Sequence, residues 1–271
     1  MANGSRRRID FATLAGLIIA VCGILGGLAL EGGKFTDIAQ YTAALIVIGG
    51  TAGAVMVTTP SALILAAFRR LKHVMWDTTT PRADLIEQLL QFARQARRSG
   101  IASLEGPVDE ITDDPFLKKA LQLLVDGTDL QDLRRIMELE IDAAERRGEA
   151  EARVFETAGG YAPTIGIIGA VLGLIQVMKH LEDIERVGHG IAVAFVATVY
   201  GVGLANLVLL PAGAKIKARV EQSVEDKELV LEGVIGIAEG LNPRLLENKL
   251  GAFLEEHQVE RNPQSQLRKV G

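Results

Sequence analysis

The stretch AGGYAPTIGIIGAVLGLIQVM, residues 158–178, decides the fold of this chain. It contains no Asp, Glu, Lys, Arg or His, and a helix of about 20 residues crosses the ~30 Å hydrocarbon core of a bilayer. Gly169 and Gly173 lie four positions apart, which leaves one helix face smooth enough for close backbone packing. The stretch is therefore predicted to be a transmembrane helix.

Three more stretches, residues 11–30, 41–59 and 190–212, are equally free of ionisable side chains. Hydrophobic residues make up 48% of the chain, yet 23% of residues are charged, a mixture typical of membrane spans joined to a polar domain. The predicted fold class is all-α: a polytopic membrane protein with four transmembrane helices and a helical cytoplasmic domain. Residues 11–30 follow three arginines as in a signal peptide, but the apolar run is longer than the usual ~7–15 residues.

The charge pattern predicts which side of the membrane each segment faces. Placing both termini in the cytoplasm leaves only Lys34, Lys179 and Arg186 outside, among 29 Lys and Arg. The positive-inside rule favours this orientation. The predicted organisation is a cytoplasmic N-terminus (1–10), transmembrane helices 1 and 2 (11–59), a helical cytoplasmic domain (60–157), transmembrane helices 3 and 4 (158–212), cytoplasmic C-terminal helices (213–260) and a disordered tail (261–271).

Local signals predict the ends of the cytoplasmic helices. Thr80-Pro81 and Asp114-Pro115 are typical helix starts, with a capping side chain before a first-turn proline. A long helix is expected to open at Asp129 and to run directly into the third span. The fourth span is expected to continue to about residue 239, Gly240 to end it, and a last helix to cover residues 243–257.

Small residues also pattern the second and fourth spans. Gly49 and Gly53, and then Ala197, Gly201 and Ala205, recur every four positions, which predicts tight helix packing. The spacing leaves open whether that packing occurs within one subunit or between subunits.

Two prolines lie in the third and fourth spans. Pro163 and Pro211 each remove a backbone hydrogen bond, so a hinge or channel-lining role competes with simple marking of a helix end.

Ionisable groups are missing from all four predicted spans, although ion-conducting proteins normally carry one at membrane depth. The polar residues of the spans are instead neutral, and they include Thr164, Gln176, Thr198, Tyr200 and Asn206. If the chain conducts ions, a partner must supply the carboxylate.

Other function classes have no support in the sequence. We find no phosphate-binding loop, no metal-ligand spacing and no catalytic triad, so we expect neither an enzyme nor a bound cofactor. Basic residues are scattered without interleaved aromatics, which argues against nucleic-acid binding. The lone cysteine, Cys22, is read as a packing residue.

Four segments resemble flagellar motor proteins of the MotA type, in the MotA/TolQ/ExbB proton channel family. They are DFATLAGLIIAVCGILGGLALEGG from Asp10, PTIGIIGAVLGLI from Pro163, AFVATVYGVGLANLVLLP ending at Pro211, and EGLNPRLLENKL from Glu239. The resemblance covers about residues 10–257, and the order of two spans, a cytoplasmic domain and two spans agrees with the charge-derived topology.

The resemblance implies a stator subunit in the bacterial inner membrane. Such subunits form a ring, thought to be a pentamer, around a MotB-type partner whose aspartate carries the ion. The resemblance assigns functional roles to Pro163 and Pro211. It also implies that the cytoplasmic domain acts on the rotor protein FliG through charged residues, here Arg97 and Glu105, with Arg98 adjacent.

The resemblance also bears on which ion flows. Sodium-driven relatives tend to place a threonine hydroxyl on both the third and the fourth span, where oxygen ligands can replace part of the hydration shell of Na⁺. Here the fourth-span position is Thr198, but the third-span position is Ala170, whose methyl group cannot coordinate sodium. We therefore expect proton coupling, with sodium disfavoured.

Two alternatives stay open at this stage. One is an energy-transducing channel subunit like TolQ or ExbB, which has one span before the cytoplasmic domain where this chain has two. The other is a membrane scaffold that conducts no ions.

Overall fold

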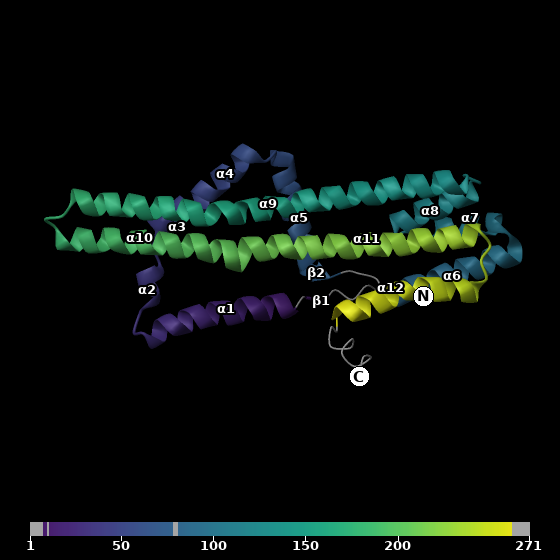
Figure 1. The fold of residues 1–271 in the computed structure, drawn as a ribbon, viewed down its shortest axis with the longest axis horizontal. Coiled ribbons are helices and arrows are strands. Elements are labelled where there is room, and N and C mark those ends of the chain that lie inside the picture. The colour runs from purple at the N-terminus through teal and green to yellow at the C-terminus, as the bar shows by residue number, and fades with distance from the viewer. Residues whose placement is uncertain (1–7, 10, 78–80, 262–271) are drawn as a thin grey trace, which may run out of the picture. The chain divides into compact units, whose positions relative to one another are not determined.

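A computed structural model of the chain describes residues 8–9, 11–77 and 81–261, and these residues are almost entirely helical (Figure 1). Most of the predicted N-terminal segment 1–10, the predicted capping residue Thr80 and nearly all of the predicted tail 261–271 lie outside the described residues. By their contacts the residues divide into two units. One is Arg6–Thr78 with Arg147–Arg219, called the membrane unit because it holds the predicted spans, and the other includes Thr79–Arg146 and the chain from Val220 onward. The second is called the cytoplasmic unit after its predicted location.

The predicted spans all fall on helices. The first is α1 (Phe11–Leu30), and the second consists of α3 (Tyr41–Ala44), a π-helical turn η1 (Leu45–Gly49) and α4 (Gly50–Thr58). The third lies inside α9 (Leu130–Lys179), and the fourth consists of α10 (Ile184–Leu204), a second π-helical turn η3 (Ala205–Leu209) and the start of α11 (Leu210–Ala238). Among residues whose side chains are described, three helices are long and apolar enough to cross a membrane, in Tyr41–Thr58, Leu130–Lys179 and Ile184–Ala238.

The remaining helices lie outside the predicted spans. They are α2 (Phe35–Ile38), α5 (Ser61–Met75), α6 (Arg82–Ser99), the 3₁₀ turn η2 (Ile101–Leu104), α7 (Glu105–Asp109), α8 (Pro115–Val125) and α12 (Pro243–Arg261).

Helix ends in the cytoplasmic unit follow the predicted caps in most places. The Asp114 carboxylate accepts hydrogen bonds from the Phe116 and Leu117 amides, both at 3.0 Å, so α8 begins at Pro115 as predicted. The long helix that was expected to start at Asp129 is α9, one unbroken helix that continues through the third span. Gly240 follows α11 with φ +67°, a left-handed conformation that suits glycine at a helix end. One predicted start is off by a residue, since α6 begins at Arg82 with Pro81 in the capping position.

The cytoplasmic unit has its own apolar core. Leu89, Leu117, Leu121 and Leu133 are fully buried in it, and α11 and α12 close it with residues such as Leu229, Ile235, Leu246 and Leu250. This core has the composition of a soluble helical domain, and it fixes α6 against α11 and α12.

The all-α prediction is confirmed, and a pair of two-residue strands lies among the helices. β1 (Arg8–Ile9) pairs antiparallel with β2 (Trp76–Asp77), with Arg8 opposite Asp77 and Ile9 opposite Trp76. Two residues are too few to show the alternating pattern by which a strand is recognised in a sequence. The pairing joins the segment before α1 to the segment after α5.

Candidate functional site

The third and fourth spans pack through a seam of small residues. A Cβ built on Gly201 would lie 2.6 Å from the Ala162 carbonyl oxygen, and one on Gly166 would lie 2.9 Å from the Ala197 carbonyl oxygen. Gly173 meets the backbone of Gly190 and Ala194 in the same way. Figure 1 shows α10 side by side with the C-terminal part of α9. The predicted close packing of these two spans is therefore formed within one chain.

The second span does not use its predicted glycines in this way. Its buried stripe is Ala43, Val47, Thr51 and Val55, spaced by four residues, and residues two positions from such a stripe lie on the opposite side of a helix. Gly49 and Gly53 are accordingly exposed, with no atom of the described chain close enough to contact an added Cβ. Within the chain, Gly50 makes the close approach instead, since its Cβ would lie 2.7 Å from Ile165 Cγ2.

Thr198 and Ala170 lie beside one of the close approaches of the two spans. They directly follow Ala197 and Gly169, where a Cβ built on the glycine would lie 2.8 Å from the alanine Cβ. Both residues are half-buried, and the Thr198 hydroxyl donates to the Ala194 carbonyl at 3.2 Å. That hydrogen bond uses the hydroxyl proton, and an oxygen lone pair remains available as an acceptor.

The two predicted functional prolines lie inside continuous helix. Pro163 is half-buried in α9, which runs through it unbroken, and it packs 3.2 Å from the Cβ position of Gly201. Pro211 is exposed and is the second residue of α11, two positions after the end of η3. Neither proline ends a helix. A π-helical turn adds a residue to the helix, and such turns occur often at functional sites.

Tyr200 supports the start of the second span from inside the fourth. Its hydroxyl donates to the Ile38 carbonyl and accepts from the Gln40 amide at 3.3 Å, so it holds the turn between α2 and α3. In the sequence Tyr200 was only one of several neutral polar residues. Its contact spans 162 positions, and no local signal could have revealed it.

An ion pair with a buried carboxylate links α5 to α9. Glu151 is buried, its carboxylate pairs with the Arg70 guanidinium, and the Phe68 and Phe155 rings pack edge to face beside it with centroids 5.4 Å apart. Sequence reasoning missed this pair, because both residues look like ordinary members of charged helices. The sequence signal for this contact is the apolar face of α5, which indicates that the helix packs against another element.

The predicted rotor-facing residues gather at one end of α6. Arg97 and Arg98 are exposed in its last turn, and Glu105 is exposed at the start of α7. Gly100, with φ +82°, turns the chain between them, and Gln95 Nε2 donates to the Ser103 carbonyl at 2.7 Å across the turn. Among the residues that the structure describes, none forms an ion pair with these three side chains, so their charges are available to a partner.

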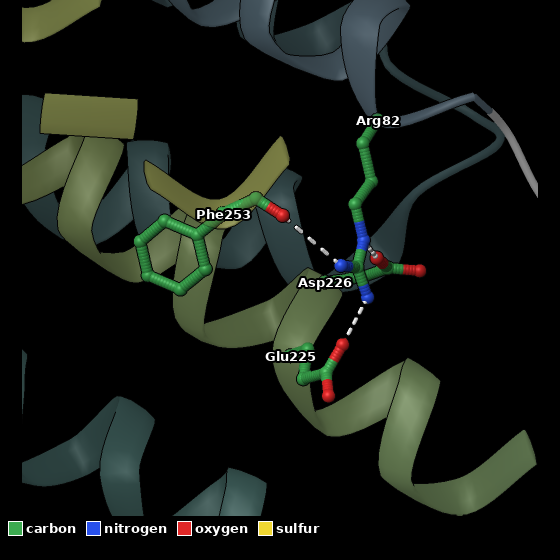
Figure 2. Close-up of polar contacts among 4 residues, drawn as sticks. All are labelled: Arg82, Glu225, Asp226 and Phe253. Atoms are coloured by element: carbon green, nitrogen blue, oxygen red, sulfur yellow. Dashed lines mark hydrogen bonds and ion pairs between the residues drawn. The ribbon is translucent and has the colours of Figure 1, made fainter. Parts of the chain in front are cut away.

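No signal in the sequence indicated the ion pairs made by Arg82. Arg82, the first residue of α6, reaches two carboxylates of α11 and a carbonyl of α12 (Figure 2). In the part of the chain with described positions, no group of three or more His, Cys, Asp or Glu side chains could hold a metal ion.

Comparison with known proteins identifies the family. A profile described as MotA/TolQ/ExbB proton channel family matches residues 109–229, and one described as Motility protein A N-terminal matches residues 14–100. The chain is 35% identical over 253 residues to Motility protein A of Bacillus subtilis, a match that covers 91% of each chain.

Solved structures agree with these matches. A chain of the C. jejuni MotAB structure superposes with a TM-score of 0.86 at 36% identity, covering 90% of this chain and 95% of that one. A chain of the flagellar MotAB stator complex from Bacillus subtilis gives 0.84 at 34% identity, covering 91% and 97%. With its two N-terminal apolar helices, its α9–α10 seam and these full-length relatives, the chain belongs to the MotA/TolQ/ExbB proton channel family as a flagellar stator subunit of the MotA type.

Proposed function

We propose that the chain is the channel-forming subunit of a flagellar stator, which couples proton flow across the inner membrane to torque on the rotor. The observation that carries this proposal is the α9–α10 hairpin. Its two helices are held together by small residues and contain no Asp, Glu, Lys, Arg or His over residues 158–178 and 190–212. Such a hairpin can line a pathway but cannot bind the ion by itself, so it must act with a partner.

A MotB-type subunit is the partner that fits this need. The similar solved structures are of MotAB complexes, and a carboxylate from such a partner would supply the missing ion-carrying group. The outer faces of the hairpin remain strongly apolar, since Ile167 is 57% exposed and Phe195 is 71% exposed. A ring of copies, which we take to be five, around the partner would cover part of these faces.

Four spans with both termini in the cytoplasm suit this assembly. α1 has 20 residues and no ionisable side chain, so we count it as the fourth span beside the three others. Pairing of β1 with β2 supports an orientation in which the segment before α1 and the segment after α5 lie on one side of the membrane. The two helices before the cytoplasmic unit also separate the chain from TolQ-like and ExbB-like subunits, for which we expect one.

Loss of swimming with intact filaments tests the proposed function. Deleting the gene should leave cells that assemble filaments but do not rotate them, and the wild-type gene should restore rotation. A mutant without filaments would point to a role in assembly, and a mutant that swims normally would contradict the proposal wherever no second stator set is present.

The exposed charges at the end of α6 are the proposed contact with FliG. Complementary charged surfaces steer association and respond to sign reversal. A triple variant Arg97→Glu, Arg98→Glu, Glu105→Lys should insert normally but swim poorly, and a compensating charge change on the rotor should restore part of the motion. Normal swimming of the triple variant would remove these residues from the contact.

Proton coupling follows from the side chains at the seam. Thr198 offers one hydroxyl oxygen and Ala170 offers none, so a sodium ion would find few ligands there. Swimming should therefore persist without sodium and stop when a protonophore collapses the proton gradient, in cells that rely on this stator alone. The opposite pattern, with sodium required and the protonophore tolerated, would overturn the choice of ion.

A further inference from the structure

Arg82 occupies a position that links three cytoplasmic helices. Its Nε donates to Asp226 Oδ1 at 2.6 Å, its Nη2 to Glu225 Oε2 at 2.5 Å, and its Nη1 to the Phe253 carbonyl at 3.3 Å. All three guanidinium nitrogens are thus used, and the Arg82 side chain is only 9% exposed. Figure 2 shows the guanidinium at the centre of this group, which we call the Arg82 clamp: Arg82, Glu225, Asp226 and the Phe253 carbonyl.

Apolar packing already holds α6 against α11, so the Arg82 clamp is not needed merely to hold the two helices together. Leu89 of α6 is fully buried, and a Cβ built on Gly233 of α11 would lie 2.6 Å from Leu89 Cδ1. Hydrophobic contact is non-directional, and by itself it leaves the angle between two helices weakly fixed. A planar guanidinium that binds two carboxylates fixes direction as well as distance.

The clamp and the apolar contact hold α6 at different points. Arg82 is the first residue of α6, Leu89 lies near its middle, and Arg97 and Arg98 lie in its last turn. At 1.5 Å per residue the two ends are about 23 Å apart, so a small change of angle at the clamp becomes a larger displacement at the arginines. Fixing α6 at two points therefore sets where its exposed charges lie relative to α11.

α11 is the cytoplasmic continuation of the fourth span. With α10 and η3 it forms continuous helix over Ile184–Ala238, and it carries Pro211 as well as the two carboxylates of the clamp. We propose that Arg82 is a positioning residue that couples α11 to α6, so that movement of the fourth-span helix is transmitted to the rotor-facing charges. This inference rests on the proposed stator function.

Partial burial makes a purely stabilising role a weak explanation for the clamp. Transferring charges out of water offsets much of their attraction, and buried ion pairs are better attested as devices that fix geometry. The expected signature of the Arg82 clamp is therefore a loss of coupling rather than a loss of fold.

The experiment measures three quantities for the complex of this chain with its partner subunit. They are the amount of complex in the membrane, the proton flux through it, read from cytoplasmic acidification in overexpressing cells, and the torque per stator unit, read from a bead on a filament stub. In Arg82→Gln, amount and proton flux should match the wild type while torque per unit falls. Arg82→Lys retains a cation and should lose less torque. The double variant Arg82→Glu, Asp226→Arg restores one ion pair and should recover part of the lost torque.

Arg146→Gln is the matched control, because the Arg146 side chain is 69% exposed and, among the described residues, pairs with Asp142 of its own helix at 3.8 Å. It should give wild-type values throughout. Unchanged torque in Arg82→Gln would overturn the inference. So would a parallel fall of amount, flux and torque in both Arg82→Gln and Arg82→Lys, since that marks a role in folding alone. Absence of proton flux and torque in the wild type would instead refute the proposed stator function.

Discussion

Single glycines set how closely the third and fourth spans approach each other. A methyl group on Gly201 would meet the Ala162 carbonyl oxygen at 2.6 Å and Gly166 Cα at 3.0 Å, both of them backbone atoms that cannot rotate away. Gly203, two residues later in the same helix, has open space at its Cβ position. The two glycines therefore differ in packing while sharing one helix.

We expect Gly201→Ala to destabilise the folded chain and Gly203→Ala to leave it nearly unchanged. Overpacking of a tight contact costs about 1–3 kcal/mol, because helices or side chains must shift. The measurement is the melting temperature of the purified protein in detergent, with Gly203→Ala as the control. Equal melting temperatures for the two variants would show that the seam is looser than its distances indicate.

The carboxyl group of Glu232 makes the stability of the cytoplasmic unit depend on pH. Burial alone would raise the pKa of its carboxyl, but hydrogen bonds and charge from Lys249 at 2.5 Å and Arg134 at 3.0 Å outweigh burial and lower it. A carboxyl with a lowered pKa in the folded state stabilises that state above its unfolded pKa of about 4.3. That stabilisation is lost as the pH falls through the lower folded pKa.

Glu232→Gln should therefore lower the melting temperature at pH 7, and the gap to the wild type should narrow below about pH 4.3 as the wild-type carboxyl takes up a proton. Melting curves of both proteins between pH 7 and pH 3 check this. A gap that widens on acidification would mean that Lys249 and Arg134 do not lower this pKa.

At the scale of helices, an ion pair between a partly exposed arginine and a buried carboxylate links α5 to α9. The side chain of Glu151 is 7% exposed, whereas that of Arg70 is 33% exposed. Removing Arg70 leaves the buried Glu151 carboxylate without its partner, whereas removing Glu151 leaves an arginine whose long side chain can reach water. Removal of Arg70 should therefore lower the free energy of unfolding more than removal of Glu151.

We expect Arg70→Ala to destabilise the protein by about 3 kcal/mol and Glu151→Ala to destabilise it by less. Arg94→Ala is the control, since Arg94 and Glu87 form an exposed pair at 3.3 Å, and such pairs contribute about 0–1 kcal/mol. Thermal unfolding in detergent measures all three. A larger effect of Arg94→Ala than of Arg70→Ala would contradict the importance given to burial.

At the scale of the whole molecule, the proposed mechanism depends on orientation in the membrane. Phe35 lies in α2, between the first two spans, and Trp76 lies in β2, after α5. In a Cys22→Ala background, a cysteine at position 35 should react with an impermeant reagent in intact cells. A cysteine at position 76 should react only after lysis. Labelling of position 76 in intact cells would reverse the orientation and remove the basis for a cytoplasmic rotor contact.

The sequence by itself determined the elements of this protein. Spans lacking ionisable residues, the Asp114-Pro115 start, the single helix from Asp129 into the third span and the end at Gly240 all depend on composition or on neighbours within a few positions. Local free energies, such as transfer of apolar side chains into lipid and capping of helix ends, suffice to specify such features. Gly173 and Gly201 of the seam were named from the four-residue spacing of small side chains. Arg97, Arg98 and Glu105 were named through the family resemblance.

Tertiary structure alone decided which residues hold those elements together. The contacts of Arg82 with Asp226, Arg70 with Glu151 and Tyr200 with Ile38 join positions separated by 144, 81 and 162 residues. It also decided that Gly201 lies in a seam while Gly53 lies on an open face, although both belong to similar small-residue patterns. The periodicity of a helix fixes which residues share a face, but only the position of the neighbouring helix decides which face is buried.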